Sequence, residues 1–228
     1  MRITVVGGTA GIGNGIALRL AKAGDQVVIG SRKAEKAEKV AGEARELLGS
    51  EADVTGAANE EAVSGAEIVV VTVPYPGLAD TYKALKPQLD ADVTVVDCNV
   101  PLASEVGGKP TRMLGIWEGS AAQQAKGILG KGTSVASGFH TVMAAKLIDV
   151  KKPLEADVLV CGDSAARKVV RQMVDKIEKA RFVNCGPLEN ARILESLTAL
   201  LIGINIRYKL DPGAGVRIAG LPDDEGSS

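Results

Sequence analysis

ITVVGGTAGIGNGIALRLA, residues 3–21, is the stretch that decides the fold. The β-branched run 3–6 leads into a turn, 7–13, in which four of seven residues are glycine, and a helical pattern follows. Glycines let a backbone turn tightly and approach a ligand closely, and the free N–H groups at the start of a helix attract phosphate. This order predicts a dinucleotide-binding fold with a pyrophosphate on the turn. A tight turn without a ligand is the alternative, because Ala10 replaces the middle glycine of GxGxxG.

The rest of the chain alternates short β-branched runs with helical patterns, as βαβ units do. We predict strands at residues 3–6, 26–29, 52–55, 68–73, 93–97, 134–137, 158–161 and 181–184. Helices are predicted at residues 13–23, 34–48, 120–128, 165–179 and 189–207. The expected fold is α/β, a doubly wound, Rossmann-like parallel sheet with a small C-terminal α/β portion. We place the nucleotide-binding domain at 1–140, the small portion at 141–228 and a frayed tail at 223–228.

The composition excludes several classes of partner. The 228 residues carry a net charge of -1 and only 3% aromatic residues, which argues against nucleic acid and membranes and favours small-molecule ligands. Three separated cysteines without a CxxC pair predict neither a disulfide framework nor a cysteine zinc site. The first residues lack a signal-peptide pattern and no run reaches transmembrane length, so we expect a cytoplasmic protein.

The end of the second predicted strand indicates which dinucleotide binds. An NAD-preferring fold carries an acidic residue about 20 residues after the glycine turn. Here Arg32 stands nineteen residues after Gly13 (32 − 13 = 19), within Gly30-Ser31-Arg32-Lys33. A hydroxyl and two cations suit a 2′-phosphate, and Lys36 falls on the same helix face as Arg32. The sequence therefore predicts NADP, with an ordinary basic loop as the alternative.

The loops that follow the later strands are expected to surround the nicotinamide, because ligands lie beyond the carboxyl ends of parallel strands. Val73-Pro74 and Val100-Pro101 would stiffen the walls of such a site, unless these prolines simply end strands. Gly138 could let the backbone approach the ring. Neither a Gly-x-Ser-x-Gly elbow nor a cysteine near a histidine in sequence is present, and hydride transfer needs no such nucleophile.

His140 is the only histidine of the chain. It is either a structural histidine or a proton donor beside a substrate, and we assign it no firm catalytic role. A lone histidine builds no zinc site unless several carboxylates or thiols converge on it, so no metal is predicted.

A second motif points to a different enzyme class. Tyr82-Lys83-Ala84-Leu85-Lys86 is a formal YxxxK, the catalytic pair of short-chain dehydrogenases. In that family the pair falls near the end of the sheet, whereas Tyr82 lies in the predicted helix after the fourth strand. We therefore reject this interpretation.

Taken together, these motifs resemble the archaeal coenzyme F420-dependent NADP reductases, over almost the whole chain to about Arg207. The residues that carry the resemblance are Gly7-Gly8-Thr9, Gly30-Ser31-Arg32 with Lys36, Val73-Pro74, Phe139-His140-Thr141, Cys161-Gly162-Asp163 and Gly186-Pro187-Leu188-Glu189-Asn190-Ala191-Arg192. It implies reversible hydride transfer between NADPH and the deazaflavin F420, in a homodimer without metal or flavin. It implies NADP contacts from Thr9, Ala10, Gly11, Ile12, Ser31, Arg32, Lys36, Val73, Val100 and Gly138. It also implies an F420 contact near Ala214.

Cations near the C-terminus are candidates for the anionic tail of F420, or else solvated surface charge: Arg192, Arg207, Lys209 and Arg217. The broad apolar face of helix 189–207 packs within the subunit or also contacts a second one. Two other functions stay open, an NADP-dependent reductase of an imine or hydroxy acid and a non-enzymatic NADP sensor.

Overall fold

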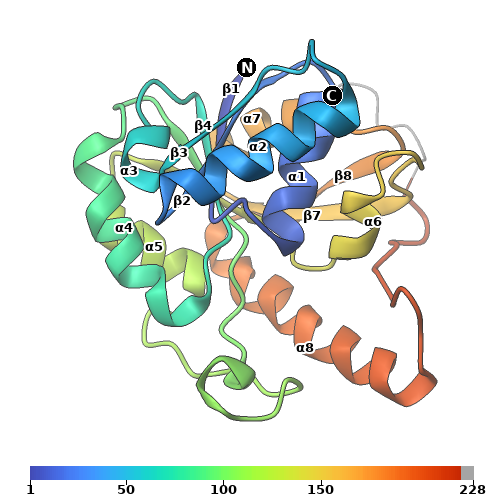
Figure 1. Cartoon of the computed structure of the whole chain (residues 1–228). Helices are drawn as coiled ribbons and strands as arrows, with labels where there is room; N and C mark the ends of the chain where they lie inside the picture. Colours follow the sequence, from blue (N-terminus) through green and yellow to red (C-terminus); the bar gives the residue numbers. More distant parts are fainter. Residues whose placement is uncertain (222–228) are drawn as a thin grey trace.

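The predicted strands all form and join one sheet of eight strands in the order β3-β2-β1-β4-β5-β6-β7-β8 (Figure 1). The computed structural model describes residues 1–221, and the predicted frayed tail lies outside them. The strands are β1 (Arg2–Val6), β2 (Gln26–Ser31), β3 (Val54–Ala58), β4 (Ile68–Val71), β5 (Thr94–Asp97), β6 (Ser134–Gly138), β7 (Ala156–Gly162) and β8 (Ala180–Asn184). The predicted boundary between 1–140 and 141–228 falls just after β6, inside this continuous sheet, and stays a prediction.

One strand pair contradicts the prediction of a parallel sheet, because β6 and β7 are antiparallel. The other six pairs are parallel. A parallel pair needs a crossover that carries the chain back along the sheet, usually a full helix. The connection here contains only α6 (Ala144–Ile148), a five-residue helix that packs against the first helix of the fold instead. Sequence periodicity did not reveal this short helix.

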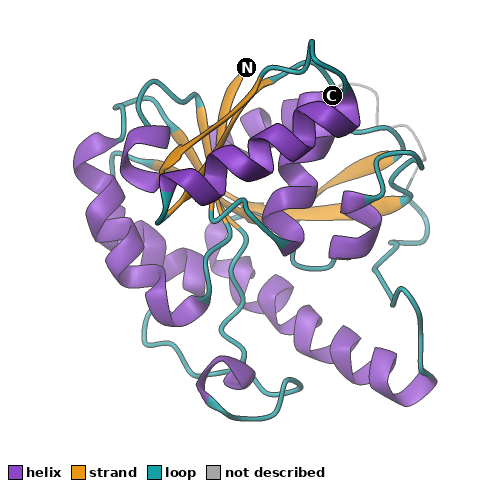
Figure 2. Ribbon diagram, in the orientation of Figure 1, coloured by secondary structure: helices purple, strands orange, loops and turns teal. Residues whose placement is uncertain are grey.

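Helices cover both faces of the sheet (Figure 2). One apolar cluster joins one face to α1, α2, α6 and α7, and a second joins the other face to α4, α5 and the start of α8. The remaining helices have these bounds: α1 (Gly11–Lys22), α2 (Ala34–Leu48), α3 (Asn59–Ala62), α4 (Leu78–Leu85), α5 (Ala121–Leu129), α7 (Ser164–Val174) and α8 (Ala191–Tyr208). Several predicted bounds were displaced by two residues or more. The largest shift is at the end of α7, predicted at residue 179 and found at Val174, and β3, predicted at 52–55, lies at Val54–Ala58.

Gly56 explains how the edge strand β3 meets its helix. A Cβ at Gly56 would lie 2.3 Å from the carbonyl carbon of Ala37, so only glycine lets α2 lie this close to β3. The backbone N–H of Gly56 also donates to the Glu38 carboxylate at 2.9 Å. Because β3 lies at the edge of the sheet, its sequence has only a weak apolar pattern. The strand was therefore predicted two residues too early, at 52–55 instead of Val54–Ala58.

The last helix, α8, reaches beyond the sheet (Figure 1). Its buried residues are Ala191, Leu194, Glu195 and Ala199, all in the first half. Farther along, exposed apolar side chains include Leu200, Ile206 and Tyr208. Within residues 1–221, no helix has both the length and the apolar character needed to cross a membrane.

Candidate active site

The glycine turn between β1 and α1 has the geometry that an anion site requires. Gly7 and Gly11 have positive φ angles of 77° and 57°, which favour glycine. A Cβ at Gly13 would lie 2.3 Å from Thr72 Oγ1, so glycine here lets α1 start close against the end of β4. The first turn of α1 holds no acidic residue and no side chain caps it. Its N–H groups therefore remain available for phosphate oxygens.

Ala10, the departure from the glycine pattern, fits this backbone. It is the N-cap residue of α1 with φ −163° and ψ 168°, an extended conformation that any residue adopts. Its side chain is exposed. The methyl group therefore strains nothing, and a glycine at this position is dispensable for the fold of the turn.

The exit of β2 lies directly beside the glycine turn. The carbonyl oxygen of Gly30 accepts hydrogen bonds from the N–H groups of Gly7 at 3.1 Å and Gly8 at 3.2 Å. Ser31 ends β2, and its Oγ accepts a hydrogen bond from the N–H of Lys33 at 3.3 Å. Arg32 and Lys36 are exposed, and neither joins an ion pair within residues 1–221. Both cations are thus available to a ligand that sits on the turn.

Loops after β4 and β5 line the same edge of the sheet. Val73 Cγ1 lies 3.2 Å from where a Cβ of Gly7 would stand, so Val73 forms a wall of the glycine turn. Asn99 Nδ2 donates to the carbonyl of Val71 at 3.2 Å and ties the end of β5 to β4. Val100, the next residue, is half-buried.

The turn after β6 is strained and clamped. Phe139 is fully buried and has a φ of 67°, which costs a non-glycine residue about 1–3 kcal/mol. The hydroxyl of Thr198 on α8 donates to the carbonyl of His140 at 2.9 Å. Gly138 precedes this turn, and a Cβ there would stand 3.3 Å from Val160 Cγ2. Contacts from α8 and β7 therefore hold the loop that is predicted to face the nicotinamide.

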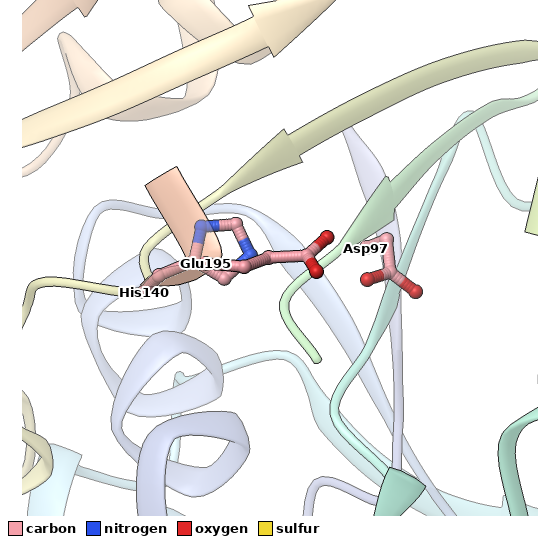
Figure 3. A group of neighbouring side chains, drawn as sticks. All are labelled: Asp97, His140 and Glu195. Atoms are coloured by element: carbon pink, nitrogen blue, oxygen red, sulfur yellow. The ribbon is translucent and has the colours of Figure 1, made fainter. Parts of the chain in front are cut away.

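His140 meets two carboxyl groups in space (Figure 3). A nitrogen of His140, a carboxyl oxygen of Asp97 and one of Glu195 all lie within 4.8 Å of one another, and the three side chains are buried. Asp97 accepts hydrogen bonds from Tyr82 Oη at 2.6 Å, Asn99 Nδ2 at 2.9 Å and Asn99 N at 3.1 Å. Glu195 accepts two from backbone N–H groups, of Ala121 at 3.0 Å and Ala122 at 3.2 Å.

Burial dominates the titration of this cluster. It raises the pKa of Glu195 to about 8, with the nearby Asp97 carboxylate adding to the shift and the two N–H donors opposing it. It raises the pKa of Asp97 to about 6, against the hydrogen bonds from Tyr82 and Asn99. It lowers the pKa of His140 to about 4. At neutral pH the cluster therefore carries one negative charge, on Asp97.

These two carboxyl groups were missed by the sequence argument. That argument assumed no carboxylates near His140, and the structure shows two, so its premise was wrong. The available signal was Glu195 itself, a lone acid among the apolar positions of α8. The hydrogen bonds above satisfy both carboxyl groups without a cation, and the absence of a metal stays a prediction.

Tyr82 confirms that the YxxxK motif is a coincidence. Its ring is completely buried in α4, its hydroxyl is bonded to Asp97, and burial raises its pKa well above the ordinary value. Such a phenol has neither the access nor the acidity for proton transfer to a substrate.

The C-terminal segment passes over the loop after β6. The N–H of Ala214 donates to Asn205 Oδ1 on α8 at 2.6 Å, and a Cβ at Gly215 would lie 3.4 Å from the carbonyl oxygen of Thr141. Ala214 thus lies beside the continuation of the His140 turn. An open pocket there is lined by Thr141, Val142, Met143, Lys146, Glu155, Ala156, Gly215, Val216 and Arg217.

Two of the candidate cations for an anionic tail, Arg192 and Arg207, lie far apart. Arg192 and Arg207 stand in the first and last turns of α8, fifteen residues apart (207 − 192 = 15), which is about 22 Å along the helix. Lys209 follows Arg207, and Arg217 lines the pocket beside Ala214. Arg192 and Arg207 therefore cannot both bind one charged group of a ligand.

Known proteins share both the sequence and the fold. Residues 2–101 match the family model described as NADP oxidoreductase coenzyme F420-dependent. The F420-dependent NADP reductase of Methanocaldococcus jannaschii is 44% identical over 97% of this chain and 99% of its own. That of Methanothermobacter thermautotrophicus is 42% identical over 99% and 97%. A crystal structure from Arthrobacter sp. FB24, of a candidate F420-dependent NADP reductase, has a TM-score of 0.73 at 24% identity, with 91% and 94% of the two chains covered, and supports the fold. By its identity to the two archaeal enzymes over nearly its full length, the chain belongs to the coenzyme F420-dependent NADP reductase family.

Proposed function

We propose that this protein transfers hydride reversibly between NADPH and coenzyme F420. The observation that carries the proposal is the carbonyl of Gly30, which accepts hydrogen bonds from the uncapped glycine turn. It thereby places the turn beside a strand exit with two cations, Arg32 and Lys36, that form no ion pair within residues 1–221. The two coenzymes supply the hydride chemistry when bound, and the protein supplies position and exclusion of water. Family membership adds F420 as the second coenzyme.

The proposed NADP site follows the carboxyl edge of the sheet. The first turn of α1 would bind the pyrophosphate, and the β2 exit would bind the 2′-phosphate. Val73, Val100 and Gly138 would flank the nicotinamide half. The complete set of proposed NADP contacts is Thr9, Ala10, Gly11, Ile12, Ser31, Arg32, Lys36, Val73, Val100 and Gly138.

The buried thiols of Cys98 and Cys161 are poor nucleophiles. Burial raises the pKa of the Cys98 thiol well above its ordinary value. It also raises that of Cys161 to about 12. Both thiols therefore stay protonated and unreactive at neutral pH. This supports a reaction that depends on holding two rings together rather than on a covalent intermediate.

F420 is proposed to contact the segment at Ala214, beside the turn after β6.

The exposed apolar side chains of α8 suit a second copy of this chain, which supports a homodimer. Sedimentation would test this, because replacing both Leu200 and Ile206 by glutamate should yield a monomer.

We place the protein in the cytoplasm, as the separated cysteines suggest.

A spectroscopic assay tests the proposed reaction. The protein is mixed with NADPH and oxidised F420, and the visible band of the deazaflavin is followed. We expect the band to bleach, and NADP with reduced F420 should restore it. An unchanged band in a protein that still binds NADP would indicate another substrate or an NADP sensor, and would overturn the proposal.

A further inference from the structure

The carboxyl group of Glu195 joins parts of the site that are far apart in sequence. It extends from α8, accepts hydrogen bonds from the first two N–H groups of α5, and lies beside Asp97 at the end of β5 and His140 after β6. Its exposed fraction is 1%, so no solvent screens its charge. Thr198, three residues later on α8, holds the carbonyl of His140. The first half of α8 therefore meets the strained turn at two places, through the hydrogen bond of Thr198 and the proximity of Glu195 to His140.

The charge state of Glu195 decides whether this contact attracts or repels. The titratable side chains around it within residues 1–221 are Asp97 on β5, His140 after β6, Cys161 on β7, Tyr75 in the loop after β4 and Tyr82 on α4. None of them is a cation at neutral pH. An ionised Glu195 would face the Asp97 carboxylate in the buried interior, where two like charges repel strongly. Only the N-terminus of α5 favours the ionised form.

We propose that Glu195 is a positioning residue which, as an uncharged acid beside the Asp97 carboxylate, docks α8 on the ends of β5 and β6 and holds the His140 turn in place for hydride transfer. Loss of its proton would place two negative charges between α8 and the sheet. The docking of α8 would then weaken, and the turn that carries Phe139 would relax from its strained conformation. The kinetic part of this inference rests on the proposed function.

Infrared spectroscopy tests the proton without any coenzyme. A difference spectrum between about pH 7 and about pH 9 should show one buried carboxylic acid losing its proton, because Asp97 is already ionised at the lower value. Glu195→Gln should remove this band. Asp97→Asn should move its midpoint to lower pH, since the repelling charge is gone. A wild-type spectrum without the band, or the same band in Glu195→Gln, would refute the proposal.

Kinetics test the positioning role. Wild-type kcat/KM for F420 should fall about tenfold per pH unit above about pH 8. Glu195→Ala should lower kcat/KM by at least about tenfold at pH 7, and Glu195→Gln should recover most of that loss and flatten the alkaline fall. The matched control is Glu189→Gln, which removes an exposed carboxyl just before α8 and should leave the profile unchanged.

Each outcome separates this inference from the proposed function. If the infrared band of the acid is present but F420 is not reduced, the proposed function is contradicted, whereas the inference that Glu195 is protonated at neutral pH still holds. Alkaline falls that are identical in wild type and Glu195→Gln would contradict the positioning role. A band that shifts on addition of Zn²⁺ or removal of metal by EDTA would show a metal site instead, and would overturn the proposal.

Discussion

At the scale of single residues, we propose that cofactor choice depends on a few side chains at the exit of β2. Arg32 and Lys36 have no protein partner in the described part of the chain, so their charges are available to a 2′-phosphate. Ser31 is buried at the strand end, where its position is fixed by the sheet. The discrimination between NADP and NAD should therefore respond to these side chains rather than to the turn.

Arg32→Ala should weaken NADP binding by about 10- to 100-fold, the effect of losing a charge-assisted hydrogen bond. NAD binding should change little, because NAD has no 2′-phosphate. Titration calorimetry with both nucleotides measures the difference. Equal losses for NADP and NAD would mean that Arg32 does not contact the 2′-phosphate.

Gly13 allows a second test, of the turn itself. A methyl group there would stand 2.3 Å from Thr72 Oγ1, so Gly13→Ala should destabilise the fold by about 1–3 kcal/mol and weaken NADP binding. Denaturation and binding measure the two effects. Adding Thr72→Ala should recover part of both losses, because it removes the clashing hydroxyl. No recovery in the double variant would show that the neighbouring backbone, rather than Thr72, is the constraint.

Sequence reasoning anticipated the glycine turn and the β2 cations because both are local patterns. It missed Asp97 and Glu195 because their relation exists only in three dimensions. Glu195 is 98 residues from Asp97 (195 − 97 = 98), and only the packing of α8 brings the two together. Periodicity identified α8 as apolar and gave no reason for its one buried acid.

At the scale of elements, the largest departure from prediction lies after β6, and smaller shifts affect the bounds of β3 and α7. The antiparallel pairing of β6 with β7 and the short helix α6 follow from long-range packing that no local pattern specifies. The order of strands and helices, by contrast, follows from hydrophobic patterns of two and 3.6 residues. The strands of the last third then provide an anchor for the C-terminal segment.

That anchor is a buried ion pair between neighbouring strands. Arg181 on β8 donates two hydrogen bonds to Asp157 on β7, at 2.8 Å and 2.7 Å, and one each to the carbonyls of Ile218 and Leu221. The N–H of Ile218 also donates to Asp157 Oδ2 at 2.6 Å. The segment that contains Ala214 is thus tied down beyond its C-terminal end.

Arg181→Met should destabilise the protein by about 3–5 kcal/mol, because it leaves the Asp157 carboxylate buried without its partner. It should also raise the KM for F420 more than that for NADPH, since the released segment carries the proposed F420 contact. Urea denaturation and steady-state kinetics provide the measurements. The double variant Asp157→Leu, Arg181→Met should be more stable than Arg181→Met alone, because it removes the unpaired carboxylate. If both variants lose the same free energy of unfolding, the unpaired charge is not the cause of the loss.

At the scale of the whole molecule, the buried cluster links folding stability to pH. The folded pKa of Glu195, about 8, is above its ordinary value, so the stability that its proton provides is complete at low pH and is lost as pH rises toward about 8. Asp97 acts in the same direction up to about pH 6. His140 acts oppositely, because its folded pKa of about 4 means that stability is lost as pH falls below about 6.5.

These opposing contributions predict a specific profile. Between about pH 6.5 and about pH 8 only Glu195 of the three titrates, so stability should fall with rising pH in wild type. Glu195→Gln should abolish this fall and leave a nearly flat profile between about pH 4 and about pH 6, because the contributions of His140 and Asp97 oppose each other there. Thermal denaturation across the range measures both changes. An unaltered slope in Glu195→Gln would assign the wild-type slope to another group.

The double hydrogen bond to the carbonyl of Gly30 has a consequence for protein engineering. It fixes the main chain of the β2 exit against the phosphate turn. Substitutions at residues 31–36 should therefore change the side chains that face the nucleotide while the backbone keeps its position. An acidic residue in place of Arg32, as NAD-preferring folds carry, would then redirect the enzyme to another nucleotide pool without any alteration of the turn. On this proposal, cofactor preference can be changed independently of the phosphate turn.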